Sequence, residues 1–380
     1  MKTAAIICEY NPFHNGHKYQ IEQIKKTHDA VVCIMSGSFV QRGAPAVFDK
    51  WTRTRAALLS GGNLVIELPV CSALNCAERF ALGGVFLSDA LGICDTLFFG
   101  SESGDINNLC EYAKILSEET DDVSEKIKSN MMLGMSFPLA KEKAYSDIIP
   151  PEFLNSPNNI LGIEYIKALN KLKSKIVPKT IKRACVSHHS LLPSGEFASA
   201  SFIREQLTKG NNISDYVPFS YPDKMKNDGL GELIRYKILE MTPDEISKIN
   251  DVTEGLENRI IEACRLYSSF DEICTHIKSK RYTLSRIRRI LLSCLIGIDK
   301  ESANKLPSYI RVLGADDTGL SLLSEIKKKT SLPMITKTAD FKSINKSFAL
   351  DIKSTDIFSI INKQGMGKDF LTSPQIIKKV

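Results

Sequence analysis

One short segment limits what this chain can fold into more than any other. The segment EYNPFHNGHKYQ, Glu9 to Gln20, follows an apolar run that predicts a strand and begins a pattern that predicts a helix. A turn in this position lies at the carboxyl edge of a parallel sheet, where open α/β folds bind their ligands. Pro12 stiffens the turn, and Gly16 lets the backbone approach a ligand closely.

Two histidines in this turn indicate phosphate chemistry. His14 and His17 are three residues apart, so they reach one side of a helix N-terminus whose free N–H groups favour phosphate. Paired imidazoles without an adjoining acid suit charge stabilisation on a reacting phosphate better than proton abstraction. The alternatives are a surface loop with unrelated histidines and a zinc site. Because the chain has six histidines and no HExxH or CxxC motif, we expect no protein-bound metal.

The first two hundred residues alternate strand patterns with helix patterns, which is typical of βαβ units around a parallel sheet. Strands are expected at 4–8, 30–35, 64–68, 95–99 and 175–181, and helices at 17–27, 51–59, 72–91, 105–116, 159–172 and 199–207. The polar segment 118–151 predicts a helical insertion or a loop. The fold class that follows is α/β, with a doubly wound parallel sheet.

Prolines and a glycine interrupt the chain at Pro218, Pro222 and Gly229, and helical patterns dominate from there to the end. Residues 309–314 are the exception, because their pattern also fits a short strand. We therefore predict two domains, a doubly wound α/β domain at 1–225 and a mainly α-helical C-terminal domain at 226–380.

Composition excludes several classes of protein. With 43% hydrophobic and 25% charged residues, disordered and fibrous chains are poor interpretations. No apolar run approaches the roughly 18 residues of a membrane span, so we expect no membrane partner. Ten dispersed cysteines, mostly within apolar runs, predict free thiols in a reducing compartment, the cytoplasm. The net charge of +6 is mild, so an anionic partner must be sought in local charge.

A second phosphate-binding pattern stands near the end of the α/β region, in FASASFIRE, Phe197 to Glu205. Ser199 and Ser201 supply hydroxyls and N–H groups at a helix start, and Arg204 can hold two phosphate oxygens. The alternative is an ordinary serine N-cap. Two such segments at one sheet favour a phosphate-binding site.

The first segment resembles the HxGH signature of the nucleotidyltransferase superfamily related to class I aminoacyl-tRNA synthetases, with Asn15 in the variable position. Further strings narrow this resemblance: SGSFVQRGAPAVFDKWTR, NLVIELP, FFGSE, SPNNILGIEYIKAL and IKRACVSHHS. Together with the two phosphate-binding patterns, they resemble the bacterial tRNA(Met) cytidine acetate ligase family over most of residues 1–210, and more loosely over the helical remainder.

The resemblance implies a HIGH-type Rossmann-like nucleotidyltransferase domain and a two-step reaction. Acetate attacks the α-phosphate of ATP, which is accompanied by Mg²⁺, and the acetyl group of the acetyl-adenylate passes to N4 of the wobble cytidine (position 34) of elongator tRNA(Met), without acetyl-CoA. His14 and His17 are then the catalytic residues. By motif, the ATP site comprises Ile7, Cys8, Glu9, Tyr10, Asn11, Pro12, Phe13, His14, Asn15, Gly16, His17, Lys18, Tyr19, Gln20, Gly100, Asn159, Arg183, Ser199, Ser201 and Arg204. Asn158 is the alternative to Asn159, because the motif can be aligned one residue apart.

Basic residues are densest in HIKSKRYTLSRIRRIL, His276 to Leu291, which contains no Asp or Glu. Such a patch would neutralise RNA phosphates without reading sequence, although a solvated basic face is the alternative. The predicted tRNA-binding residues are Lys278, Lys280, Arg281, Arg286, Arg288 and Arg289.

For other polar residues near the second strand, the sequence predicts a role less precisely. Gln41 and Arg42 predict a loop that contacts acetate, nucleotide or the incoming base. Lys50, Arg53 and Arg55 either serve phosphates or form a basic helical face.

Two other functions fit parts of the sequence. An adenylyltransferase acting on a small phosphorylated metabolite would share the histidine and serine motifs but would need no basic helical region. A non-catalytic RNA-binding protein with a relic nucleotide fold would not need His14, His17 and Arg204 together.

Overall fold

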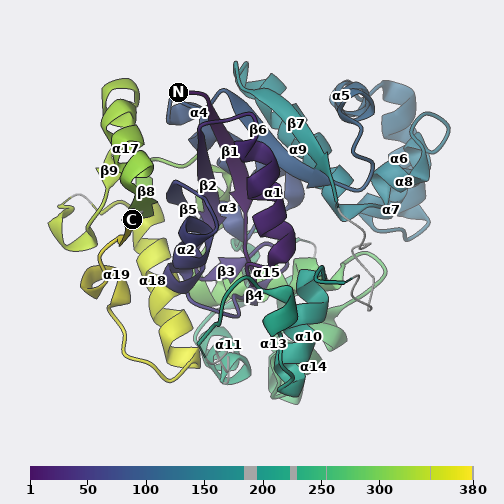
Figure 1. Cartoon of the computed structure of the whole chain (residues 1–380). Helices are drawn as coiled ribbons and strands as arrows, with labels where there is room; N and C mark the ends of the chain where they lie inside the picture. The colour runs from purple at the N-terminus through teal and green to yellow at the C-terminus, as the bar shows by residue number, and fades with distance from the viewer. Residues whose placement is uncertain (184–194, 223–228, 254, 343, 379–380) are drawn as a thin grey trace.

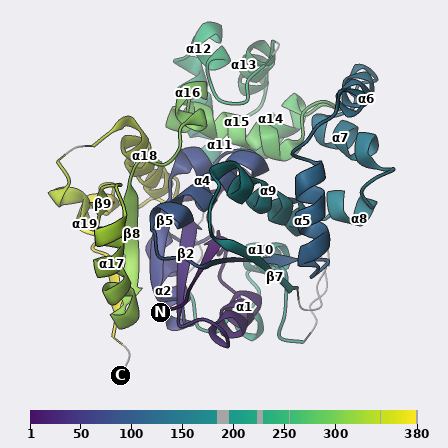
Figure 2. The ribbon, with the colours of Figure 1, turned by 90° about the horizontal axis from the view of Figure 1, so that it is seen from above.

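The computed structural model describes residues 1–183, 195–222, 229–253, 255–342 and 344–378. Its centre is a twisted sheet with helices on both faces (Figures 1 and 2). Along the sheet the strands lie in the order β10-β8-β5-β2-β1-β6-β7, and β9 pairs with β8. Their bounds are β1 (Thr3–Cys8), β2 (Ala30–Ser36), β5 (Leu64–Leu68), β6 (Thr96–Ser101), β7 (Val177–Lys182), β8 (Ile310–Asp316), β9 (Met334–Ile335) and β10 (Gln375–Ile377).

The first five strands of this sheet confirm the parallel α/β prediction. Strands β5, β2, β1, β6 and β7 all run in parallel, and β1 is paired on both sides. The chain proceeds outward from β1 through β2 to β5, then returns to β6 on the other side of β1. This reversal creates a switch point between β1 and β6, whose carboxyl ends are where such sheets bind ligands.

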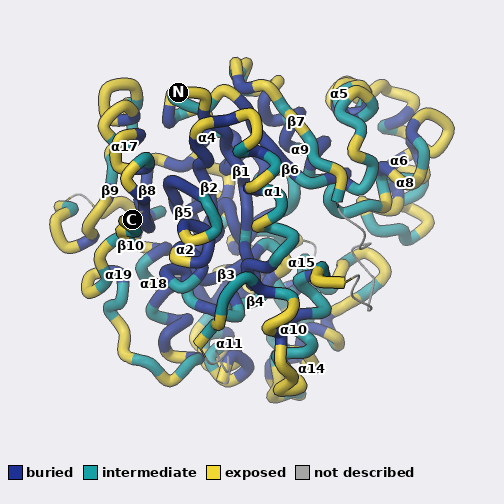
Figure 3. Tube along the Cα trace, viewed as in Figure 1, coloured by how far each residue is buried: buried dark blue, intermediate teal, exposed yellow. Residues whose placement is uncertain are grey.

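Two apolar cores hold helices against the sheet. One face packs against α4 (Ala77–Ala90) and α9 (Pro157–Leu172), and the other against α1 (Asn15–Lys25) and α2 (Lys50–Leu59). Figure 3 shows the buried strands between the more exposed helices. The predicted single helix at 72–91 is wrong in one respect: it is divided into α3 (Val70–Ala73) and α4. The division lies at Asn75, whose side chain bonds the carbonyls of Cys71 and Ala303.

The polar segment 118–151 is a helical insertion beside α9. It contains α6 (Asp121–Met132) and α7 (Phe137–Tyr145), and is followed by α8 (Pro151–Leu154). The helix α5 (Ile106–Ile115) precedes it, and α10 (Ala200–Lys209) and the short η1 (Ser214–Tyr216) follow β7. The small hairpin β3 (Phe39–Val40) and β4 (Ala44–Pro45) extends the loop after β2.

A third apolar core joins the helices that follow residue 229. They are α11 (Leu230–Leu239), α12 (Pro243–Ser247), α13 (Leu256–Leu266), α14 (Phe270–Ile277), α15 (Leu284–Ile296), α16 (Lys300–Asn304) and, later in the chain, α18 (Lys346–Ile361). The predicted helical region is therefore present. Residues of α3 and the β3–β4 hairpin belong to the same core, so this region packs directly on the loops at the sheet edge.

The sheet itself continues beyond residue 225. The short strand expected as an alternative at 309–314 is present as β8, but its place in this sheet was not predicted. Strand β8 pairs antiparallel with β5, and β9 and β10 add to β8 in parallel. The helix α17 (Asp317–Lys329) covers this edge, and η2 (Thr338–Asp340) and α19 (Lys368–Leu371) complete it. The sheet is thus parallel except at one pairing. The division into domains at residue 225 stays a prediction, but the sheet takes strands from both sides of it.

The basic residues of α2 have structural roles. Lys50 is buried and forms ion pairs of 2.9 Å with Glu67 and 2.8 Å with Asp369, while Arg311 lies 3.5 Å from Asp369. Arg53 is buried and donates to the backbone carbonyls of Ser36 at the end of β2 and of three loop residues, Glu9, Gly37 and Phe48. Both side chains are buried and neither lines the cavities at the carboxyl end of the sheet, so both expectations for Lys50 and Arg53 are wrong, whereas Arg55 is exposed as on a basic helical face. Arg53 instead fixes the loops after β1 and β2.

Candidate active site

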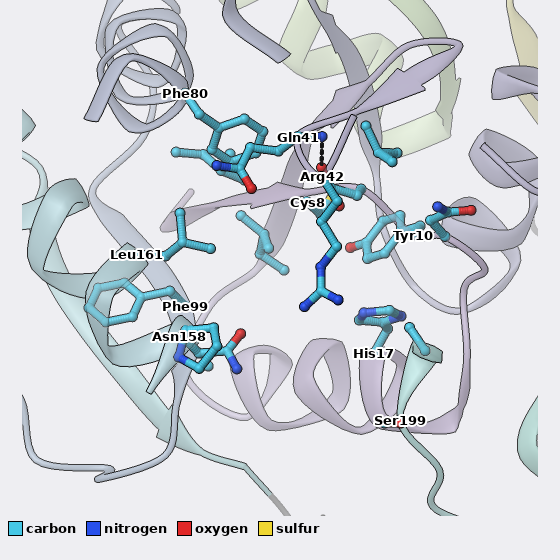
Figure 4. Close-up of a pocket in the computed structure, with 18 of the residues that line it drawn as sticks. Cys8, Tyr10, His17, Gln41, Arg42, Phe80, Phe99, Asn158, Leu161 and Ser199 are labelled. Carbon is cyan, nitrogen blue, oxygen red and sulfur yellow. Dashed lines mark hydrogen bonds between the residues drawn. The ribbon is translucent and has the colours of Figure 1, made fainter. Parts of the chain in front are cut away.

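A cavity lies at the switch point of the sheet. It has a volume of about 390 Å³ and is lined from β1, the turn before α1, the β3–β4 hairpin, the end of β6, α9 and the start of α10 (Figure 4). An adjoining cavity of about 70 Å³ continues between α1 and the end of β7, past Gly16, Tyr19 and Phe197. The residues that line both cavities, and so stand where the two meet, are His14, His17, Gln20, Gly100 and Arg183.

His14 begins α1 as its N-cap and is held by the backbone. Its Nδ1 accepts the N–H of Gly16 at 3.1 Å, and Nδ1 of His17 accepts the N–H of His14 at 3.3 Å. The two rings stack with centroids 3.7 Å apart. Because both Nδ1 atoms accept, each neutral ring carries its proton on Nε2 and can donate from there.

Burial keeps these imidazoles uncharged. It lowers the pKa of His14 to about 3, with smaller contributions from Arg183 and Arg204. Burial also lowers the pKa of His17 well below its usual value, and His14 and Arg183 add to this effect. The pair therefore offers two fixed N–H donors at the positive end of a helix, which is suited to phosphate oxygens.

These low pKa values predict how stability depends on pH. In the unfolded chain each histidine takes up a proton near pH 6.5, whereas the folded chain excludes it, so stability falls as pH drops below that value. Between about pH 6.5 and pH 5, His14 alone is expected to cost about 2 kcal/mol of unfolding free energy. Urea unfolding of the ligand-free chain measures this. His14→Asn should make the decline with falling pH less steep, and an unchanged slope would contradict the burial of a neutral ring.

A second helix start faces the histidines. Ser199 is the N-cap of α10, and its Oγ accepts the N–H of Phe202 at 3.1 Å. Arg204 donates to the carbonyl of Asn11 at 2.7 Å and to Oγ of Ser201 at 3.0 Å, which ties α10 to the turn before α1. Burial lowers the pKa of Arg204 to about 10, so it is still charged at neutral pH. Two helix N-termini and an arginine thus converge on one cavity.

Most residues of the predicted ATP site line the two cavities. Those lining one or both are Ile7, Cys8, Glu9, Tyr10, Asn11, His14, Gly16, His17, Tyr19, Gln20, Gly100, Arg183, Ser199, Ser201 and Arg204. The structure therefore brings both ends of the α/β region together, as the two phosphate-binding patterns led us to expect.

Five predicted ATP-site residues do not line either cavity. Pro12, Phe13 and Lys18 belong to the turn and to α1, and Asn15 instead donates to the carbonyls of Glu196 and Asp215, both at 3.0 Å. Asn15 thereby joins α1 to the segments on either side of α10, a role that its variable place in the motif did not indicate.

The asparagine that faces the cavity is Asn158 and not Asn159. Asn159 is buried, and its amide bonds the N–H groups of Glu102 and Ser103 and the carbonyl of Glu152. Asn158 lines the cavity, with Oδ1 3.5 Å from Nη1 of Arg183. The one-residue alternative is thus the placement found, because a helix turns neighbouring side chains about 100° apart.

Sequence reasoning missed the apolar part of the cavity. Phe80, Phe99, Leu161 and Tyr165 line it from α4, β6 and α9 (Figure 4). Apolar residues on helices that cover a sheet are expected in the core, so the sequence pattern gave no reason to place these four beside a ligand.

The predicted tRNA-binding residues divide into two groups. Lys278, Lys280 and Arg281 are exposed in the connection between α14 and α15. Arg286 and Arg288 contact Asp251 and Asp271, and the largely buried Arg289 lies beneath the β3–β4 hairpin. Arg289 is therefore close to the cavity, although its position in the sequence suggested otherwise.

A switch-point cavity with an HxGH turn and an opposing serine-rich helix start defines a nucleotidyltransferase of the HIGH class. The model of the HIGH Nucleotidyl Transferase family matches residues 1–371. The tRNA(Met) cytidine acetate ligase of Clostridium novyi is 42% identical over the full length of both chains, and that of Caldanaerobacter subterraneus is 44% identical over 96% of each.

Solved structures agree. The apo structure of Thermotoga maritima TmcAL aligns over the full length of both chains, with a TM-score of 0.90 and 32% sequence identity. Its complex with alpha-thio ATP aligns with a TM-score of 0.87 and 33% identity. The chain belongs to the tRNA(Met) cytidine acetate ligase family, and it is an enzyme, an ATP-dependent ligase. None of its described helices is long and apolar enough to cross a membrane.

Proposed function

We propose that this enzyme activates acetate with ATP and transfers the acetyl group to N4 of the wobble cytidine of elongator tRNA(Met). A carboxylate oxygen of acetate forms a bond to the α-phosphorus, and pyrophosphate leaves with the electron pair of the broken P–O bond. The cytidine amine then attacks the acyl carbon, loses a proton, and displaces AMP. The family membership supports this choice of substrates.

The observation that carries the first step is the stacked pair of neutral imidazoles at the α1 N-terminus. Their Nε2–H groups and the N–H groups of two helix starts would donate to phosphate oxygens that gain negative charge during the attack. Such donors act most strongly where water is excluded and need no rearrangement during the reaction.

Mg²⁺ would accompany ATP and withdraw charge from its phosphates. The described residues contain no group of three or more side chains suited to hold a metal. The cavity does offer the carboxylate of Glu9, which accepts the N–H of Gln41 at 2.6 Å and whose pKa is raised by burial. Since Mg²⁺ prefers phosphate oxygens and waters with one or two carboxylates, ATP itself would supply most of its ligands.

The test is acetate-dependent exchange of labelled pyrophosphate into ATP in the absence of tRNA. We expect exchange with acetate and none with acetyl-CoA. We also expect the reaction to take place in the cytoplasm, where its tRNA is. Exchange that requires a phosphorylated metabolite instead would identify the adenylyltransferase alternative. No exchange with any acceptor would favour the relic RNA-binding protein.

The RNA surface has its own prediction. Replacing Lys278, Lys280 and Arg281 with Ala should weaken tRNA binding and leave acetate-dependent exchange intact, because these exposed residues lie outside both cavities. We expect the slope of log affinity against log salt to fall by about two to three. The matched control replaces Lys327, Lys328 and Lys329 of α17 with Ala. It removes the same charge from the sheet edge that lies away from α14 and α15 (Figure 1). Equal affinity in both triple variants would reject this surface.

A further inference from the structure

The β3–β4 hairpin brings a charged side chain to one particular side of the cavity. Its turn, Val40 to Gly43, connects β3 to β4 beyond the end of β2. The Arg42 guanidinium points into the cavity between Asn158 and His17 (Figure 4). Arg183 stands on the opposite side at the end of β7, and Arg204 is tied to α10. Among the described arginines of the cavity, Arg42 is therefore the one that enters from the β2 side.

The two cavities indicate where the nucleotide would lie, given the proposed function. The smaller one, between Gly16, Tyr19 and Arg183, extends toward β7 from the stacked histidines. A nucleoside that occupies this cavity together with the adjoining part of the larger one leaves its α-phosphate at His14 and His17, where the cavities meet. A carboxylate that attacks this phosphate must then approach through the larger cavity, from the side of β2 and Arg42.

The hairpin turn is held in place by a helix from the C-terminal part of the chain. Nη1 of Arg289 on α15 donates to the carbonyl of Gln41 at 3.3 Å, and the N–H of Gln41 donates to Glu9 at 2.6 Å. Gly43 has a φ of +76°, and a Cβ there would lie 2.6 Å from Cβ of Arg288 and 2.7 Å from N of Arg289. The turn thus contacts α15 at a point where only glycine fits.

We propose that the Val40–Gly43 turn is the acetate-side wall of the cavity, that Arg42 binds the carboxylate of acetate, and that Arg289 is the residue that positions this wall. This inference rests on the proposed function and adds to it where acetate binds and which residue binds its carboxylate. A guanidinium holds a carboxylate by two parallel hydrogen bonds, which also orients the attacking oxygen. The helical region then serves the activation step as well as RNA.

The experiment measures KM for acetate and for ATP separately in pyrophosphate exchange without tRNA. Arg42→Gln should raise the acetate KM by about tenfold or more, since hydrogen bonds to charged groups are strong, with the ATP KM unchanged. Arg289→Gln should raise the acetate KM in the same way, and Arg289→Lys should restore part of the loss. Arg235→Gln is the matched control, because Arg235 also donates to a backbone carbonyl in the helical region, that of Cys264.

A glycine pair tests the same wall without changing charge. Gly43→Ala should raise the acetate KM, whereas Gly134→Ala should not, because Gly134 has a similar φ of +86° and open space around it. These variants keep the proposal testable should Arg289→Gln fail to fold. A rise in the ATP KM with an unchanged acetate KM, or no change in either for Arg42→Gln, would overturn the inference while the proposed function stands. Absence of acetate-dependent exchange in the unmodified enzyme would instead contradict the proposed function.

Discussion

His14→Asn and His17→Asn are each expected to slow acetate-dependent pyrophosphate exchange about a hundredfold or more, the usual cost of removing one donor to developing charge. Asparagine is chosen because its Oδ1 stands near the position of Nδ1 and can keep the N-terminal hydrogen bonds of α1, while Nε2 is lost. Alanine at either position should lower the rate as well, but it also removes those bonds.

The control for these variants is His28→Asn. His28 is buried too, but its ring bonds Thr27 and Thr96 at the other end of the sheet, outside both cavities. Exchange should survive this change. If both active-site variants kept near-normal exchange while remaining folded by circular dichroism, the histidines would have no part in the chemistry.

The second large effect concerns stability. Lys50→Met should lower the unfolding free energy by about 3–5 kcal/mol, because it leaves Glu67 and Asp369 buried with Arg311 as their remaining cation. Burial already raises the pKa of Glu67, and losing Lys50 raises it further. The folded variant then binds a proton more readily than the unfolded chain, so its deficit should shrink as pH falls from about 8 to about 5.

Chemical denaturation of paired variants measures this effect. The exposed Arg55→Met on the same helix should change stability little, and adding Glu67→Gln to Lys50→Met should recover part of the loss. A deficit equal to that of Arg55→Met, or one that grows as pH falls, would contradict the account of a buried ion network.

The sequence could predict the parts of the site that local chemistry determines. The HxGH turn after the first strand and the serine-rich start of α10 are each complete in one short segment, and both lie at the cavity. Asn158 and Asn159 could not be separated, since the alignment of a motif does not fix which side chain a helix turns inward.

Other features depend on contacts between distant segments. Strand β8 pairs with β5 although about 245 residues separate them, and a short buried strand looks the same whichever edge it joins. In the sequence, Arg289 looks like any other basic residue of a charged helix. Its contact with Gln41, 248 positions away, forms only when the helical region packs against the hairpin. The roles of Lys50 and Arg53 were missed for the same reason.

The adenylate route is tested most directly by bypassing its first step. Synthetic acetyl-adenylate and elongator tRNA(Met) are supplied to the enzyme without ATP, and the tRNA nucleosides are analysed by mass spectrometry. The account predicts N4-acetylcytidine at the wobble position, with His14→Asn far less impaired here than in exchange. No product from acetyl-adenylate, or product from acetyl-CoA alone, would contradict it.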